Sequence, residues 1–193
     1  MNNFTSIGKK IVAIGRNFSD HAKELGSTVP TSPLFFLKPT SSYLLQGGSV
    51  ELPKGSEVHH EVELGVVIGK NGRDITANEA SDYIAGNNYH YICINLKIQG
   101  YALGIDLTAR DLQVNDQIKQ NGSTKDMVFK IPTLIEHVSS IMRLEKGDLI
   151  LTGTPSGVGP IFAGDVIIAG LNVGDKILSQ VEFPVVQRNR FNK

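Results

Sequence analysis

Two glutamates separated by a single residue, Glu61 and Glu63, lie within an otherwise apolar run that ends at Ile68. If residues 60–68 form a β-strand, alternation places both carboxylates on the same face. Neighbouring carboxylates repel each other and are costly to bury alone, so a positive partner is expected beside them. A hard divalent cation such as Mg²⁺ or Mn²⁺ suits these oxygen ligands. The alternative is the solvent-facing edge of an amphipathic strand.

A second apolar run, residues 101–107, is interrupted by Asp106 shortly before Arg110 and Asp111. An acidic residue near the end of an apolar strand can cap a following helix, or it can be a third metal ligand. Spacing alone favours neither interpretation.

His21 and Glu24 lie three residues apart in a segment that has a short helical pattern. On a helix the two side chains are neighbours, so the carboxylate can orient the imidazole and raise its basicity, as a water-activating general base requires. The alternative is a surface pair of little consequence.

A glycine-rich segment follows the apolar run at 149–152 and continues to Pro160. It has no lysine at the position that a phosphate-binding loop requires, and no helical pattern follows it. Its backbone N–H groups and the Thr154 hydroxyl could hold a small carboxylate. The alternative is a simple glycine-rich turn.

The elements that must position these residues are mainly short strands. The 20 glycines and 8 prolines fall largely between short β-branched runs, a pattern typical of strands joined by tight turns. Helical patterns occur at 19–25, with Asn17 or Ser19 as N-cap, at 133–142 after Pro132, and more weakly at 77–83. The predicted strands are 11–14, 34–37, 60–68, 101–107, 149–152, 165–168 and 176–183. This pattern predicts a mainly β fold with short helices (α+β).

Composition narrows the function classes. The 193 residues suit a single domain, and 19 basic against 19 acidic side chains leave no net charge to attract nucleic acid or an anionic membrane. No apolar run approaches the roughly 20 residues of a membrane-spanning helix. Cys93 is the single cysteine, so no internal disulfide can form. Because the first residues resemble no secretory signal, we expect a cytoplasmic or mitochondrial protein.

Five blocks of this sequence resemble, in order, the fumarylacetoacetate hydrolase family, specifically its small acylpyruvase branch. The blocks are IVAIGRNFSDHAKELG, PLFFLKPTSSYL, HHEVELGVVIGK, GYALGIDLTARDLQ and IMRLEKGDLILTGTPSGVGP. They span most of the chain between residues 11 and 160. The resemblance implies a mixed β-roll of the fumarylacetoacetase C-terminal type, which is usually dimeric, so we expect a homodimer.

The resemblance also implies roles for individual residues. One Mg²⁺ or Mn²⁺ would be held by Glu61, Glu63 and Asp106, and His21 with Glu24 would form the water-activating dyad. Further positions match residues that contact the substrate or lie near the pocket in relatives: Arg110, Gln113 and Thr154 contact its carboxylate and keto oxygens, while Arg16 and Lys38 lie nearby.

Members of this family hydrolyse a carbon–carbon bond in acylpyruvates, or decarboxylate or tautomerise oxaloacetate. All of these reactions pass through an enolate that a metal-bound 2-oxo acid can form. The resemblance therefore implies a small 2-oxo-acid substrate.

Two departures from the family pattern occur within the single domain, residues 1–193. Residues 87–99, which include Cys93, form an atypical insertion, and a segment that carries a catalytic lysine in relatives is missing after Gln113. A retained intron and a skipped exon would produce this pair of changes, so one hypothesis is an altered splice product or gene model. We expect impaired turnover. The alternative is a catalytically inactive member that binds a 2-oxo acid or pairs with an intact subunit.

Overall fold

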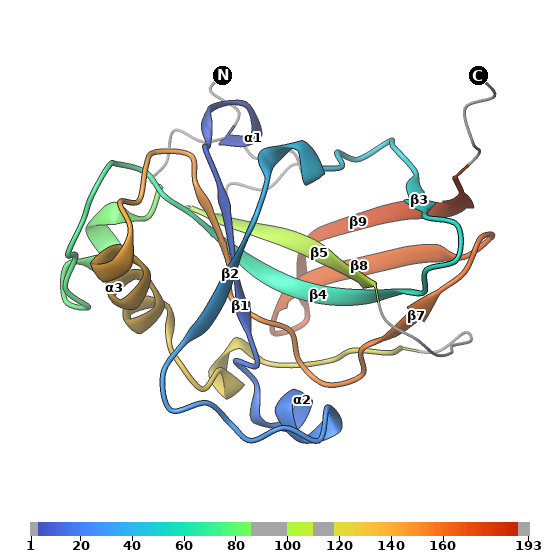
Figure 1. Ribbon diagram of the computed structural model, residues 1–193, viewed down its shortest axis with the longest axis horizontal. Coiled ribbons are helices and arrows are strands. Elements are labelled where there is room, and N and C mark those ends of the chain that lie inside the picture. The colour runs from blue at the N-terminus through green and yellow to red at the C-terminus, as the bar shows by residue number, and fades with distance from the viewer. Residues whose placement is uncertain (1–3, 86–99, 110–117, 189–193) are drawn as a thin grey trace.

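The structure, a computed structural model, describes residues 4–85, 100–109 and 118–188 (Figure 1). The atypical insertion at 87–99, Cys93 within it, and the junction after Gln113 lie outside these residues, as does Arg110. Within the described part the chain forms two β-sheets and a few short helices, which confirms the predicted mainly β, mixed fold.

The larger sheet contains six strands. They are β1 (Ile11–Gly15), β2 (Leu34–Lys38), β4 (Val58–Val67), β5 (Tyr101–Ala109), β6 (Leu149–Leu151) and β7 (Gly159–Ile161). The order is β2-β1-β6-β4-β5, and β7 pairs with β4. β1 and β6 are parallel, whereas β4 is antiparallel to β5, β6 and β7. In Figure 1, β1 and β2 cross the direction of β4 and β5, so residues far apart in the sequence approach one another.

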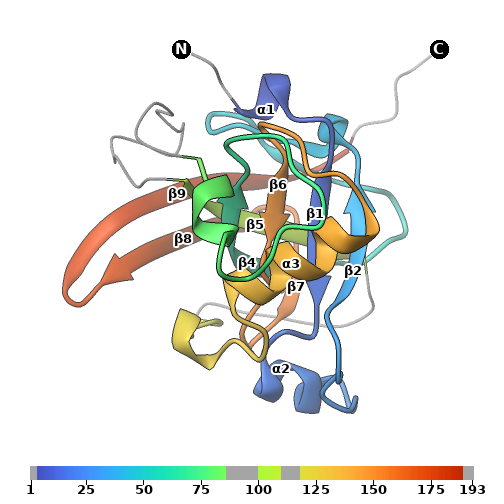
Figure 2. The ribbon, with the colours of Figure 1, turned by 90° about the vertical axis from the view of Figure 1, so that its left-hand side faces the viewer.

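The smaller sheet has the order β3-β9-β8. Its strands are β3 (Val50–Leu52), β8 (Val166–Val173) and β9 (Lys176–Gln187). β8 and β9 are joined by the two residues Gly174 and Asp175, and Gly174 has a φ of 57°. A two-residue connection with glycine at its first position is typical of a tight β-hairpin. The hairpin projects from the body of the molecule as a curved ribbon (Figure 2).

The helices are α1 (Phe4–Ile7), α2 (Ser19–Glu24) and α3 (Ile131–Ile141), with short 3₁₀ turns η1 (Thr40–Ser42), η2 (Ala80–Tyr83) and η3 (Thr124–Asp126). α3 lies across the larger sheet (Figure 2). Its Leu134, Ile135 and Val138 are fully buried against Val12 and Ile150 of that sheet. A second core lies between the two sheets and includes residues of β5 and β9, such as Leu103, Val181 and Phe183.

Several expectations about the elements need correction. The sequence pattern missed α1, β3 and β7, each of which has only three or four residues. The helix expected at 77–83 is the 3₁₀ turn η2. The helix expected at 133–142 runs from Ile131 to Ile141, and its last residue, Ile141, is 52% exposed.

The expected N-cap of α2 is also corrected. Phe18 occupies the N-cap position and makes no side-chain cap. Asn17 is instead fully buried, and its amide bonds the Phe129 and Thr152 backbone. Asn17 therefore ties the end of β1 to two distant loops.

Candidate active site

Three carboxylates meet on one face of the paired strands β4 and β5. The antiparallel register places Glu61 directly opposite Asp106, and Glu63 opposite Gly104. Side chains opposite one another in such a pair share a face and lie about 5 Å apart at Cβ. Glu61, Glu63 and Asp106 are 9%, 4% and 3% exposed. This burial excludes the solvent-facing edge considered as an alternative.

Asp106 lies inside β5, which continues for three further residues to Ala109. It is therefore not the N-cap of a helix that follows directly. Two residues before Asp106, on the same face of β5, residue 104 is a glycine. A Cβ at Gly104 would lie 3.0 Å from Leu151 Cδ2. The Leu151 side chain of β6, which reaches over β4, leaves little room for a side chain at this position.

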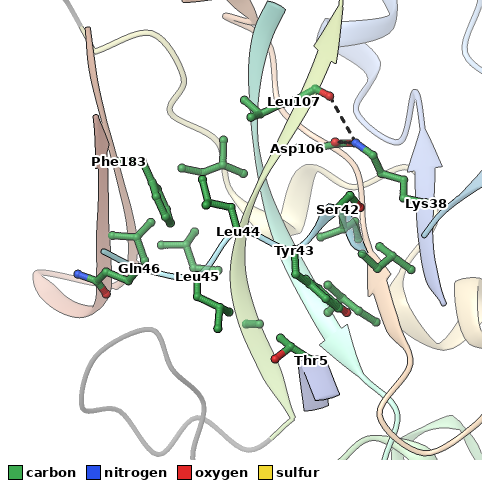
Figure 3. A pocket seen from close by; sticks show the side chains of 18 of the residues that line it. Thr5, Lys38, Ser42, Tyr43, Leu44, Leu45, Gln46, Asp106, Leu107 and Phe183 are labelled. Carbon is green, nitrogen blue, oxygen red and sulfur yellow. Dashed lines mark hydrogen bonds and ion pairs between the residues drawn. The ribbon is translucent and has the colours of Figure 1, made fainter. Parts of the chain in front are cut away.

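Lys38, at the end of β2, supplies the positive charge expected beside the carboxylates. Its ammonium contacts Asp106 Oδ1 and donates to the Leu107 carbonyl at 3.4 Å (Figure 3). Burial lowers the pKa of Lys38, while Glu63 and Glu61 act in the opposite direction. Lys38 and Asp106 are 68 residues apart in the sequence, so only the crossing of the strands brings them together.

Glu63 is held by the glycine-rich loop. The Gly153 N–H donates to Glu63 Oε2 at 2.6 Å. Burial raises the pKa of Glu63 to about 8, and this N–H and Lys38 only partly oppose the effect. Gly153 has a φ of 95°, and a Cβ there would approach Asn17 Cβ to 2.8 Å. Glycine is thus required by both backbone conformation and space.

His21 and Glu24 form the predicted pair on α2. His21 Nδ1 lies 3.2 Å from Glu24 Oε2, and His21 is only 3% exposed, so this is not a free surface pair. The Gly157 N–H donates to both Glu24 oxygens at 3.1 and 3.2 Å. Since Nδ1 faces Glu24, Nε2 is the imidazole nitrogen left for other contacts.

A cavity of about 680 Å³ gathers most of the predicted site residues. Predicted residues that line it are Arg16, His21, Lys38, Glu61, Glu63 and Thr154. Arg16 reaches it from the turn after β1, where its φ is 57°. Arg110 and Gln113 lie outside the described residues, so their predicted contacts stay predictions.

An adjoining apolar cavity of about 360 Å³ lies on the other side of Lys38. Lys38 and Leu107 line both cavities, and Asp106 lines the apolar one. Figure 3 shows Lys38 extending toward Asp106 while Leu44, Leu45 and Phe183 surround the apolar space. The Lys38–Asp106 pair therefore lies at the boundary of the two cavities.

The Thr154 hydroxyl is engaged within the protein. It donates to the Val62 carbonyl at 2.9 Å and accepts from Gln120 Nε2 at 2.7 Å. Gln120 also accepts from the Val62 N–H at 2.8 Å. Its amide thus connects β4 to the glycine-rich loop. The sequence analysis missed this residue, because a lone glutamine far from both partners carries no local signal.

Among the residues that the structure describes, no three His, Cys, Asp or Glu side chains lie so that they could hold a metal ion as they stand. Asp106 is instead paired with the Lys38 ammonium. The donor set is nevertheless that of a hard divalent cation: buried carboxylate oxygens on one face of one sheet.

The fold and these residues define a class of enzymes built on a mixed β-roll, and sequence comparison identifies the family. The fumarylacetoacetate (FAA) hydrolase C-terminal family matches residues 10–89 and 112–186. The chain belongs to the fumarylacetoacetate hydrolase family, which confirms the resemblance noted from the five sequence blocks.

Two curated relatives match nearly the whole chain. The mitochondrial oxaloacetate decarboxylase of Dictyostelium discoideum is 44% identical over 234 aligned positions, which cover 98% of this chain and 100% of the relative. A mitochondrial oxaloacetate tautomerase of Arabidopsis thaliana is 41% identical, with 94% and 92% covered. The first alignment is longer than the 193 residues here, so that relative has residues without a counterpart in this chain.

Solved structures show the same fold. A 5-carboxymethyl-2-hydroxymuconate delta-isomerase from Mycobacterium smegmatis has a TM-score of 0.75 at 30% identity, covering 95% of this chain and 80% of that one. A fumarylpyruvate hydrolase from Pseudomonas aeruginosa, solved with Mn²⁺ and pyruvate, has a TM-score of 0.74 at 23% identity, covering 94% and 91%.

The relatives' names agree with the expected mitochondrial or cytoplasmic location. No helix within the described ranges is long and apolar enough to cross a membrane.

Proposed function

We propose that this chain binds a small 2-oxo acid and a divalent cation in the cavity of about 680 Å³ that His21 and the glutamates line. There it would promote enolisation, as in the tautomerisation or decarboxylation of oxaloacetate. One observation carries the proposal: His21, braced by Glu24, lines the same cavity as the buried glutamates Glu61 and Glu63. The names of the two curated relatives support oxaloacetate as the substrate. Hydrolysis of acylpyruvates is the second candidate, because it uses the same enolate chemistry.

Glu61, Glu63 and Asp106 would hold the cation, Mg²⁺ or Mn²⁺. When bound, the cation would polarise the keto oxygen of the 2-oxo acid. The same fold holds Mn²⁺ together with pyruvate in the fumarylpyruvate hydrolase structure.

The remaining roles fall to residues around the cavity. His21 Nε2 would exchange the proton, because Nδ1 is occupied by Glu24, which is itself anchored by the Gly157 N–H. Arg16 would attract the carboxylate of the substrate from the rim. Arg110 and Gln113 would provide further substrate contacts.

The test of binding uses Mn²⁺ with oxalate, a stable dicarboxylate that resembles the enolised substrate. A ligand that binds only the folded state increases the free energy of unfolding, by about 2.7 kcal/mol at 100-fold excess over Kd, and therefore raises Tm. Glu61→Gln should abolish the shift. Glu57→Gln should retain it, because Glu57 pairs with His59 at 3.0 Å and does not line this cavity. Equal shifts in both variants would contradict the proposed site.

Turnover is measured by following the enol absorbance of oxaloacetate. We expect slow conversion compared with the Dictyostelium relative, because the lysine-bearing segment after Gln113 is missing, and no conversion in His21→Ala. Conversion at the relative's rate would contradict the expected impairment. Oxalate binding without any conversion would identify this chain as a catalytically inactive family member.

We further propose a homodimer. The outer face of the β8–β9 hairpin leaves apolar side chains exposed, among them Val166 at 52% and Ile168 at 62%. A second copy would cover this surface.

A further inference from the structure

The Lys38–Asp106 pair joins two distant strands at the centre of the candidate site. Lys38 ends β2, and Asp106 lies within β5. The side chain of Asp106 is 2% exposed and that of Lys38 is 23% exposed, so water screens their attraction only partly. The Lys38 ammonium is in direct contact with Asp106 Oδ1, as Figure 3 shows.

Buried carboxylates that are ionised need a positive partner whether or not a metal is present. Glu61 and Glu63 lie on the same sheet face as Asp106, and both attract Lys38 electrostatically. A lysine supplies one positive charge to compensate them, and a divalent cation supplies two. Two cations on the same carboxylate would repel each other strongly in a site with little water.

We propose that Lys38 is a built-in counter-cation that competes with a divalent metal ion for Asp106. Without metal, its ammonium holds the carboxylate face together, and metal binding requires it to leave Asp106. This inference rests on the proposed metal site and adds to it a residue that sets the metal affinity. The cavities on both sides of Lys38 give the long side chain space to move.

Two opposite effects of one substitution follow. Removing the ammonium leaves buried carboxylates without that partner, so the metal-free protein should lose stability. The same removal takes away a competitor for the metal, so Mn²⁺ should bind more tightly. A lysine with a purely structural role would not improve metal binding when it is removed.

The experiment compares Lys38→Met with wild type by isothermal titration calorimetry with Mn²⁺ and by thermal unfolding in EDTA. Methionine keeps the length of the side chain and removes the charge. We expect a Tm in EDTA lower than that of wild type and a Kd for Mn²⁺ at least about tenfold lower.

Lys10→Met is the matched control. Lys10 also pairs with a buried carboxylate, Asp148, whose side chain is 0% exposed, but this pair lies outside the proposed metal site. Lys10→Met should lower the Tm in EDTA and leave the Kd for Mn²⁺ unchanged.

A second measurement uses the wild-type protein alone, in case Lys38→Met does not fold. The rate at which an amine-specific reagent modifies Lys38 is followed by mass spectrometry of the peptide that contains it. We expect the rate to rise several-fold when Mn²⁺ is added, relative to Lys10 in the same sample. An unchanged or reduced rate would overturn the competition.

The outcomes separate the two proposals. If Mn²⁺ binds wild type and Lys38→Met equally, or binds the variant more weakly, the competition is wrong and the metal site stands. If Mn²⁺ binds neither protein, the metal site itself is wrong, and the competition falls with it. Binding to Lys38→Met alone would support the competition in its strongest form.

Discussion

The Glu63 carboxylate is costly to keep ionised because it is buried. The residue is 4% exposed, and the Gly153 N–H and Lys38 only partly compensate its burial. The pKa of Glu63 therefore rises to about 8 from an ordinary value of 4.5. Carboxyl groups with such a strongly raised pKa are typical of functional sites, where a bound cation can supply the positive charge that the fold does not.

In the metal-free protein we expect stability to fall as pH rises between about 5 and 8. The unfolded chain loses the Glu63 proton near pH 4.5, whereas the folded chain keeps it to about pH 8. Between these values the folded state binds more protons, so raising the pH favours unfolding, by at most about 1.4 kcal/mol per pH unit. Below pH 4.5 the penalty is absent, and above about pH 8 it is complete.

Urea denaturation in EDTA at several pH values measures this dependence. Glu63→Gln should flatten it, because glutamine has no proton to lose. Glu57→Gln, which changes a glutamate outside the cavity, should leave the slope as in wild type. A variant Glu63→Gln with an unchanged slope would show that another group is responsible.

At the scale of elements, the glycine-rich loop after β6 organises the site. Its Gly153 N–H holds Glu63, its Gly157 N–H holds Glu24, and its Thr154 hydroxyl bonds β4. The loop thus links the carboxylate face to the helix α2 that carries His21. The backbone donors expected to hold a ligand carboxylate bind the protein's own carboxylates instead.

Gln120 fixes this loop, and its replacement tests that role. The Gln120 amide accepts from His60 and the Val62 N–H, and donates to Thr154 and the Pro155 carbonyl. Gln120→Met should lower the free energy of unfolding by about 2–3 kcal/mol, because it leaves several partly buried groups without partners.

Gln187→Met is the matched control for that substitution. Gln187 is exposed and donates one bond, to the Leu52 carbonyl at 2.8 Å. Because water can replace that donor, the loss should stay below about 1 kcal/mol. Urea denaturation measures both variants, and equal losses would show that Gln120 has no special role in the loop.

The site could be anticipated only in part, and the reason is visible in its members. Glu61 with Glu63, and His21 with Glu24, are close in sequence, so strand and helix periodicity predict which side chains share a face. Lys38 and Gln120 meet their partners across 68 and 34 residues. No local pattern specifies such contacts.

At the scale of the molecule, the projecting β8–β9 hairpin is the surface on which we expect self-association. Its inner residues, such as Val181 and Phe183, are buried, while Val166 and Ile168 face outward. Alternation along the strands makes one face core and leaves Val166 and Ile168 exposed on the other, where Glu182 lies opposite Ile168.

Ile168→Lys should therefore convert dimers to monomers, measured by size-exclusion chromatography with light scattering. Val173→Lys is the control, because Val173 is 65% exposed beside the Gly174 turn at the hairpin tip and should not affect the dimer. A dimer that persists in Ile168→Lys would place the interface elsewhere.

The sequence by itself determined the family, the mainly β fold and the local pairs of the site, because these depend on residue type and on short-range backbone periodicity. Only the tertiary structure decided that Asp106 lies opposite Glu61, that Lys38 reaches Asp106, and that Gln120 anchors the loop. Strand register and strand crossing result from packing the whole core, so the charge that balances the buried carboxylates emerges only when the chain is folded.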